Sequence, residues 1–294
     1  MKTYLLRRRS LGRSSVRGII AFSKEGIEGY RSDGMKHDEA NYVKSELPND
    51  ADLCIRWGCT STVPTKKVLN EASAIHYVSD KAGSRKAFAD AGLAPRTFLS
   101  FVDYQLGASF LPAVVRPPVH SQGRNIDLCN TAEEVQKACQ KYGEVYISEF
   151  IDKVAEYRVF AMQGRVVWVA RKTPADPKAL AWNVAQGGHF DNVRWGDWDM
   201  NVVKVGLTAF NMTGLDFGGV DVMVDSTGRA YVLEINSAPS QTSPYRQECC
   251  ARAFDHLLQT YESRGKERYD IDGWNWKGTI HPGLIETIKK GDDQ

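Results

Sequence analysis

The chain has 294 residues, of which 42% are hydrophobic and 25% charged, a composition typical of a folded globular protein. The formal net charge of +2 argues against strong overall attraction to nucleic acid or to an anionic membrane surface. No apolar run approaches the roughly 18 residues that a membrane span needs. Length alone allows one large domain or two to three smaller ones.

The cysteines point to free thiols. None of them forms a C-x-x-C pair, and no histidine cluster accompanies them, which argues against a zinc site. A disulfide framework is not expected in a chain of this length without a secretory signal. We therefore expect a reducing, cytoplasmic location. The cysteines are Cys54, Cys59, Cys129, Cys139, Cys249 and Cys250.

The first 24 residues contain seven basic residues and no acid. Three interpretations compete: a transit peptide, which is also rich in Arg and Ser, a nucleic-acid-binding arm, and an ordinary first strand. We favour a strand over Thr3–Arg8, running into a segment capped by Ser14, because Tyr4-Leu5-Leu6 is typical of a buried strand.

Further short strands are predicted at Glu28–Arg31 and Leu53–Trp57, and a helix at Thr65–Ala74. Alternating strands and helices indicate a small α/β unit over residues 1–78. This region contains no Gly-rich phosphate loop of either common type, so it is not predicted to be a Rossmann cofactor domain.

A second unit is predicted from residue 79. Ser79 is expected to cap a helix that contains Lys81 and ends at Gly92. A strand ends at Pro117 and carries Arg116, and a loop with the single glycine Gly123 follows. After a Thr-capped helix at 131–142, a strand runs over 145–151.

The next strands are predicted over 156–160 and 165–170 and look half-buried. They bring Arg158, Arg171 and Lys172 onto or near a shared surface, which is either a solvated charged face or a binding site for phosphates or an acidic substrate. A loop with Asn183 follows, and then an amphipathic helix over Asp197–Thr213 with Met212 among its inward residues.

The helix is followed by a β-hairpin signal, two apolar runs around a polar Asp-Ser-Thr-Gly tip. Glu234 and Asn236 share one face of the second strand, and register decides whether Asp221 joins them. An even-length tip pairs Asp221 with Val232 on that face, whereas a three-residue tip bulged at Gly228 pairs it with Leu233 on the other. We expect the even register.

The three side chains Asp221, Glu234 and Asn236 would then form an oxygen-rich cluster. Mg²⁺ prefers oxygen ligands and usually keeps waters and substrate phosphates in its shell. Two carboxylates and one amide oxygen supply charge without closing the site. The alternative is a surface hairpin whose three polar residues face water.

Asp221 followed by Glu234-Ile235-Asn236 and Pro239 resembles the metal-binding signature of the ATP-grasp ligases. That superfamily includes D-alanine–D-alanine ligase, glutathione synthetase and the ligase that adds glutamates to a ribosomal protein. The resemblance extends over roughly residues 78–244, because other family motifs occur in the family's order. Asn183, followed by Gly187-Gly188, resembles a segment of the ribosomal-protein glutamate ligase group, although Gln186 stands where a basic residue is common.

The resemblance implies an α/β (α+β) chain with the ATP-grasp fold. A small N-terminal α/β domain (1–78) would precede two α+β subdomains that clasp ATP (79–148 and 149–263, the second with the metal site), followed by a tail (264–294) in which Trp274 and Trp276 suggest packing onto the body or a partner.

The resemblance also implies the roles of single residues. Two Mg²⁺ ions, with Mn²⁺ as an alternative, would lie on Asp221, Glu234 and Asn236, and ATP would be bound by a larger set. A nearby cation, Arg158 or Arg171, would stabilise the tetrahedral oxyanion, with Asn183 in the nucleotide or metal environment. The implied ATP-binding residues are Lys81, Arg116 (a lysine in the family), Gly123, Glu149, Phe150, Ile151, Glu156 as the ribose-binding acid, and Lys172.

The implied reaction joins a carboxylate to an amine through an acyl phosphate, with ATP converted to ADP and phosphate. The substrates would be small-molecule, peptide or protein-tail carboxylates and amines, and a homodimer is an alternative to a monomer. Rival interpretations are an ATP-grasp kinase, a non-catalytic nucleotide-binding or structural protein with the same fold, and a nucleic-acid-binding protein.

Overall fold

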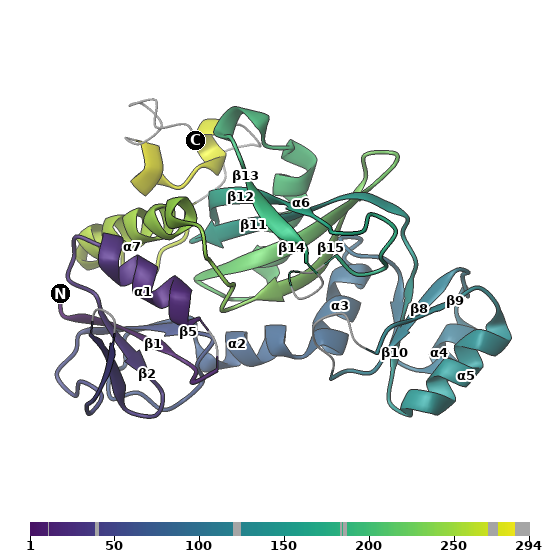
Figure 1. Cartoon of the computed structure of the whole chain (residues 1–294), viewed down its shortest axis with the longest axis horizontal. Coiled ribbons are helices and arrows are strands. Elements are labelled where there is room, and N and C mark those ends of the chain that lie inside the picture. Colours follow the sequence, from purple (N-terminus) through teal and green to yellow (C-terminus); the bar gives the residue numbers. More distant parts are fainter. Residues whose placement is uncertain are drawn as a thin grey trace.

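The computed structural model describes residues 1–10, 12–38, 41–119, 125–182, 184, 187–269 and 276–285. Three β-sheets follow one another along the chain, each with its own helices (Figure 1). The predicted mixed α/β class is confirmed, and the predicted positions of Gly123 and Asn183 lie outside the described residues.

The first sheet has six strands in the order β4-β3-β2-β1-β5-β6. Its centre, β1, pairs in parallel with both β2 and β5, and every residue of β1 is buried. The ordinary-strand interpretation of the basic N-terminus is therefore confirmed. The strands are β1 (Thr3–Arg7), β2 (Glu28–Arg31), β3 (Met35–Asp38), β4 (Asn41–Lys44), β5 (Leu53–Trp57) and β6 (Val68–Leu69). Helix α1 (Arg13–Phe22) connects β1 to β2 and follows Gly12 without the predicted Ser14 cap.

The helix predicted over Thr65–Ala74 is wrong. The segment forms β6 and then turns at Asn70, whose φ is +62°. Asn70 donates its backbone N–H to Asp216 Oδ2 (2.6 Å), and its Oδ1 accepts from the Asp216 N–H (2.8 Å), so a distant strand start replaces the helical hydrogen bonds. Helix α2 (Ala72–Ser79) starts later, and Asp80, not Ser79, caps α3 (Lys81–Asp90) by accepting from the Gly83 N–H at 3.0 Å.

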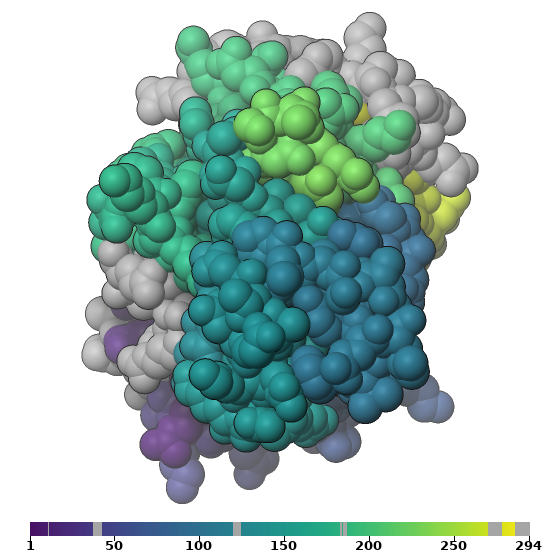
Figure 2. Space-filling view, turned by 90° about the vertical axis from the view of Figure 1, so that its right-hand side faces the viewer, coloured from purple at the N-terminus to yellow at the C-terminus, as the bar shows by residue number. Residues whose placement is uncertain are grey.

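The second sheet has the order β7-β10-β8-β9 and lies at the opposite end of the molecule from the first (Figure 1). Figure 2 looks onto this unit, with the tip of the third sheet's hairpin above it. The predicted Thr131 cap is confirmed as a capping box with Glu134. The elements are β7 (Thr97–Phe98), α4 (Phe101–Leu106), β8 (Ala113–Arg116), β9 (Asp127–Cys129), α5 (Ala132–Tyr142) and β10 (Tyr146–Glu149).

The third sheet, ordered β13-β12-β11-β14-β15, positions the site. Its strands are β11 (Lys153–Met162), β12 (Arg165–Thr173), β13 (His189–Val193), β14 (Phe217–Asp225) and β15 (Ala230–Asn236). Helix α6 (Met200–Met212) packs on one face, where Gly206 lies against Val159 and Val222. A short 3₁₀ turn, η2 (Trp195–Asp197), stands where the helix was predicted to begin, and Met212, predicted to point inward, is 41% exposed.

The other face of this sheet divides into an apolar end and a charged end. At the apolar end, Trp57 of β5 stacks on Phe217 and Phe160, with ring centroids 5.4 and 6.2 Å away, so the first and third sheets share one core. The charged end carries the predicted site residues on alternate positions of β11, β12, β14 and β15.

Helix α7 (Pro244–Arg264) lies along α1 (Figure 1). The tail elements α8 (Trp276–Thr279) and η3 (Pro282–Leu284) pack on the body: Ile280 bridges to Val166, and Leu284 is fully buried. Trp274 lies outside the described residues. Within the described part of the chain, each helix lacks the length or the apolar character needed to cross a membrane.

Candidate functional site

The β14–β15 hairpin places Asp221 directly opposite Glu234. The predicted even register is wrong: Val222 pairs with Val232, so the tip has three residues and Gly228 adopts φ +84°. The register then shifts between Asp221 and Val222, because Leu233 is an extra, bulged residue. This bulge returns Glu234 to the face of Asp221, so the predicted sharing of a face is confirmed for a different reason.

Each carboxylate of this pair is held by a protein cation. Asp221 accepts two hydrogen bonds from the Arg158 guanidinium, at 2.5 and 2.7 Å. Glu234 accepts from Lys81 Nζ at 2.9 Å and from Asn236 Nδ2 at 3.1 Å. Burial opposes ionisation of Glu234, but the charge and hydrogen bond of Lys81, together with the Asn236 bond, outweigh it and lower the pKa of Glu234 to about 2.

The donor set fits a hard divalent cation. Two carboxylates and an amide lie on one face of adjacent strands, and they supply the oxygen ligands that Mg²⁺ prefers. Within the described residues, no group of three or more His, Cys, Asp or Glu is arranged to hold a metal, so a metal here would need Asn236 and oxygens from a ligand.

A row of cations continues along the same face. Glu156 is 2% exposed and forms ion pairs with Lys153 (2.9 Å) and Lys172, which also lies 3.8 Å from Asp221. Burial lowers the pKa of Lys153, although Glu156 opposes this shift. Arg171 is the neighbour of Lys172 on β12 and is exposed on the opposite face. The structure therefore brings Arg158 and Lys172 to the acidic pair and leaves Arg171 away from it.

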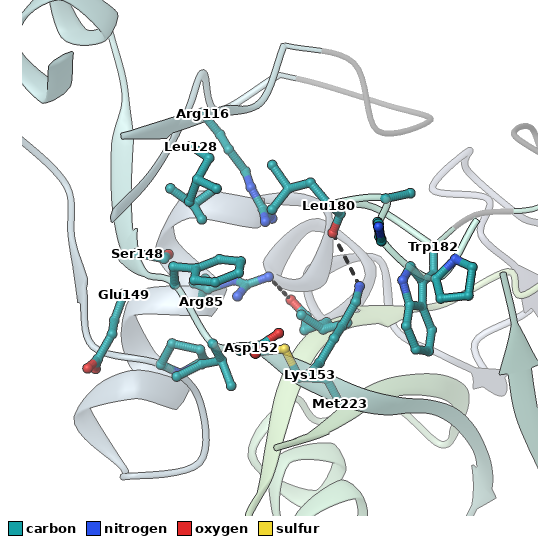
Figure 3. A pocket seen from close by; sticks show the side chains of 18 residues that line it. Arg85, Arg116, Leu128, Ser148, Glu149, Asp152, Lys153, Leu180, Trp182 and Met223 are labelled. Atoms are coloured by element: carbon teal, nitrogen blue, oxygen red, sulfur yellow. Dashed lines mark hydrogen bonds between the residues drawn. The ribbon is translucent and has the colours of Figure 1, made fainter. Parts of the chain in front are cut away.

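A cavity of about 180 Å³ lies beside this row. The segment Glu149–Ile151, called the hinge below, lies where β10 of the second sheet leads into β11 of the third. Its residues line the cavity together with Trp182 and Lys153 (Figure 3). The Glu149 carboxylate points away from the cavity and forms two hydrogen bonds with Arg96, at 2.9 and 3.1 Å.

The backbone of the hinge is partly occupied. The N–H groups of Glu149 and Phe150 donate to the carbonyls of Arg96 and Pro112. Within the described chain, Ile151 N–H has no such backbone partner. A planar ring in this cavity would therefore find its hinge N–H donor at Ile151.

A second cavity, of about 380 Å³, contains Lys81, Glu234 and Asn236. Arg85, Arg116 and Leu233 line both cavities, so the two are adjacent and meet at these residues. Arg85 donates to the carbonyl oxygen of the bulged Leu233, and burial together with the charge of Arg116 lowers the pKa of Arg85 to about 10.

Arg116 is the cation at the junction that lacks a partner. Within the described residues it forms no ion pair, and its Nε is buried without a hydrogen-bond partner. Figure 3 shows its side chain directed toward the first cavity. A buried N–H group without a hydrogen-bond partner is costly, so this position favours an anion that would accept from it.

The chain is similar in sequence and in structure to known ligases. No family model matches the chain. D-alanine–D-alanine ligase from Methylacidiphilum infernorum is 25% identical over 219 residues, covering 68% of this chain and 72% of that protein. The crystal structure of D-alanine–D-alanine ligase from Bacillus anthracis superposes with a TM-score of 0.58 at 15% identity, covering 90% of this chain and 96% of that one.

The chain has the ATP-grasp fold. A RiPP-associated ATP-grasp ligase from Chryseobacterium gregarium, solved with ADP and a leader and core peptide, superposes with a TM-score of 0.60 at 11% identity, covering 91% of this chain and 99% of that one. Together these similarities support an ATP-grasp carboxylate–amine ligase.

The two cavities are lined by further residues that were not predicted from the sequence. Arg85 follows Lys81 by one helical turn, and this i, i+4 spacing was a usable signal. Lys153, Trp182 and the bulged Leu233 gave no comparable signal, because their roles depend on how three sheets meet.

Proposed function

We propose that the chain is an ATP-dependent ligase that joins a carboxylate to an amine, forming an amide or peptide bond through an acyl phosphate and releasing ADP and phosphate. The observation that carries this proposal is the junction of the two cavities at Arg116, an unpartnered cation within the described residues. One cavity suits a base beside the hinge, and the other suits phosphates beside Glu234 and Asn236.

The nucleotide would extend from the first cavity into the second. The backbone at Ile151 and the ring of Trp182 border the adenine end. Lys81 and Arg116 lie at the phosphate end. Glu156 remains our candidate for the ribose hydroxyls, although it now contacts Lys153 and Lys172. Gly123 remains a candidate for covering the phosphates.

Asp221, Glu234 and Asn236 would hold two Mg²⁺ ions, which would neutralise charge on the phosphates. Lys81 and Arg158 now pair with the two carboxylates. With the carboxylates engaged by metal, both cations become available to a phosphate or to substrate oxygens. The fit of these residues supports the metal assignment.

The chemistry follows from this placement. A substrate carboxylate oxygen attacks the γ-phosphorus, and ADP leaves. The amine nitrogen then attacks the acyl carbon, the amine loses a proton, and inorganic phosphate leaves. Arg158 lies on the same face as the acidic pair, so we assign it to stabilising the oxyanion. Arg171 is less suited to this role, because it lies on the opposite face of the sheet.

Hydroxylamine provides the test, because it traps acyl phosphates as hydroxamates. The protein would be incubated with MgATP, hydroxylamine and pools of carboxylic acids that include amino acids and peptides. We expect ADP and hydroxamate in equal amounts, dependent on the acid. Arg158→Lys should lower the rate more than Arg171→Lys, its matched control on the opposite face.

Omitting the amine distinguishes the rival enzyme. A ligase needs an amine for rapid multiple turnover, whereas a kinase releases ADP at the same rate without one. ADP release independent of every acid, or MgATP binding with no turnover in any pool, would contradict the ligase assignment.

A further inference from the structure

The basic N-terminal segment contains none of the residues assigned to ATP binding. Arg7 is 2% exposed, and its Nε contacts His37 Nε2 at 3.0 Å. Its Nη1 donates to the backbone carbonyls of Arg8 and Arg9, at 2.8 and 3.0 Å. Arg7 therefore fixes the chain that leaves the carboxyl end of β1, and with it the starting point of the Arg8 side chain.

Arg8 lines the second cavity, which Lys81, Glu234 and Asn236 also line. Its neighbours in the lining of this cavity include Ser237 and Ala238, which follow β15. Arg8 does not line the first cavity. Its side chain forms no ion pair with any described residue. Among the described residues, Arg8 is thus a second cation without an ion-pair partner, and it lies on the side of the cavity formed by the first sheet.

A separate open groove of about 900 Å³ runs along α1. Ile20, Ala21 and Phe22 supply an apolar wall, and Phe22 is 39% exposed. Arg17 lines the same groove and forms no ion pair with any described residue. No acidic residue of the described chain lines it.

The groove is electropositive. His37 also lines it, and its pKa is lowered to about 4 by burial and by the charges of the neighbouring arginines. Those arginines are Arg7, Arg17, Arg13 and Arg31. The groove therefore combines apolar contact area with an excess of positive charge.

Hydrogen bonds connect the groove along α1 to the second cavity. Arg7 contacts His37 in the groove and the backbone of Arg8 at the cavity. Ser15 of α1 donates to the Pro239 carbonyl (3.3 Å) and accepts from the Gln241 N–H (2.8 Å), which fixes the loop after β15 on this helix. Arg7 and Ser15 thus connect the groove along α1 to the second cavity, in which Arg8 lies with Glu234.

We propose that the α1 groove binds an acidic peptide segment of the substrate, whose reactive carboxylate reaches the second cavity past Arg8. The proposal rests on the proposed ligase function and assigns its substrate to acidic peptides. An acidic peptide fits better than nucleic acid, because the wall at Ile20–Phe22 suits apolar side chains and the net charge of the chain is only +2.

Direct binding tests the proposal without turnover. Fluorescence anisotropy would compare three labelled probes: a pool of ten-residue peptides with Glu or Asp at alternate positions and random apolar residues between them, the same pool with Lys, and a ten-nucleotide single strand. We expect the acidic pool to bind at least tenfold more tightly than either other probe. Arg17→Glu should weaken this binding at least tenfold and leave MgATP binding unchanged, and Lys137→Glu, a charge reversal on exposed α5, should change neither.

The outcomes separate this inference from the ligase assignment. Equal binding of the acidic pool to wild type and Arg17→Glu, or tighter binding of the oligonucleotide or the Lys pool, would overturn the peptide groove while MgATP binding stands. Failure to bind MgATP with peptide binding intact would instead overturn the proposed function. Circular dichroism of each variant would verify that it is folded.

Discussion

At the scale of single residues, the site is defined by which charges already have partners. Glu149 is a hinge residue whose carboxylate belongs to Arg96, outside the cavity. Arg116 has no such partner within the described chain, although it lies where the two cavities meet. These two residues should therefore differ in what they contribute to ATP binding.

Replacing Arg116 with alanine should weaken MgATP binding by about tenfold to a hundredfold, because a charge-assisted hydrogen bond contributes roughly 1.5–3 kcal/mol. Glu149→Ala should change the affinity by less than about threefold, since exposed ion pairs such as that with Arg96 contribute roughly 0–1 kcal/mol. Isothermal titration calorimetry with MgATP measures both. A larger loss for Glu149→Ala than for Arg116→Ala would contradict the placement of the phosphates.

At the scale of elements, the C-terminal segment is held by a buried histidine. His281 is 0% exposed, and its Nδ1 accepts from the Gly283 N–H at 3.2 Å. Burial, with the nearby His256 and Arg165, lowers the pKa of His281 to about 3. The unfolded chain therefore binds this proton more readily than the folded chain.

The lowered pKa of His281 makes the free energy of unfolding depend on pH. The folded pKa of His281 lies below its unfolded value of about 6.5, so its contribution to stability is fully present above about pH 6.5 and is lost as pH falls toward the folded value. One such group adds a slope of up to about 1.4 kcal/mol per pH unit. His281→Asn, which keeps an acceptor for Gly283, should show a shallower slope in urea titrations between pH 6.5 and 4. Equal slopes would show that His281 is not buried in its neutral form.

At the scale of the whole molecule, the sheets do not form equivalent units. Trp57 of the first sheet stacks on both Phe160 and Phe217 of the third, and all three are 0% exposed. The second sheet has a separate core around residues such as Val115 and Ile147. The first and third sheets should therefore unfold together.

Trp57→Ala should destabilise that joint unit by about 3–5 kcal/mol, the usual cost of removing a buried aromatic ring. Urea unfolding followed by hydrogen exchange would locate the effect. We expect faster exchange in both β1 and β14, with little change in β8 and β10. An effect restricted to the first sheet would contradict a shared core.

Part of this organisation could be predicted from sequence patterns. Alternation correctly placed strands β2 and β5, whereas Asp221 was expected on the face of Glu234 through an even register that proved wrong. The bulge at Leu233 could not be predicted, because its carbonyl is held by Arg85 from a distant helix. Nor could the contact between Asn70 and Asp216, which replaces a predicted helix, since it joins residues far apart in the sequence.

The choice between equivalent cations also required the structure. Arg158 and Arg171 are similar in the sequence, and only strand pairing places the first opposite Asp221 and the second on the other face. Gly123 and Asn183 lie outside the described residues, so their roles stay predictions from the resemblance.

The most direct test of the whole account is a titration of ATP with Mg²⁺ into wild type and Glu234→Gln. This substitution keeps the shape of the side chain and removes its charge. We predict that wild type binds MgATP and that the variant, folded by circular dichroism, loses the Mg²⁺-dependent part of the affinity. Equal binding by both proteins, or no binding by wild type, would contradict a nucleotide site built on Asp221, Glu234 and Asn236.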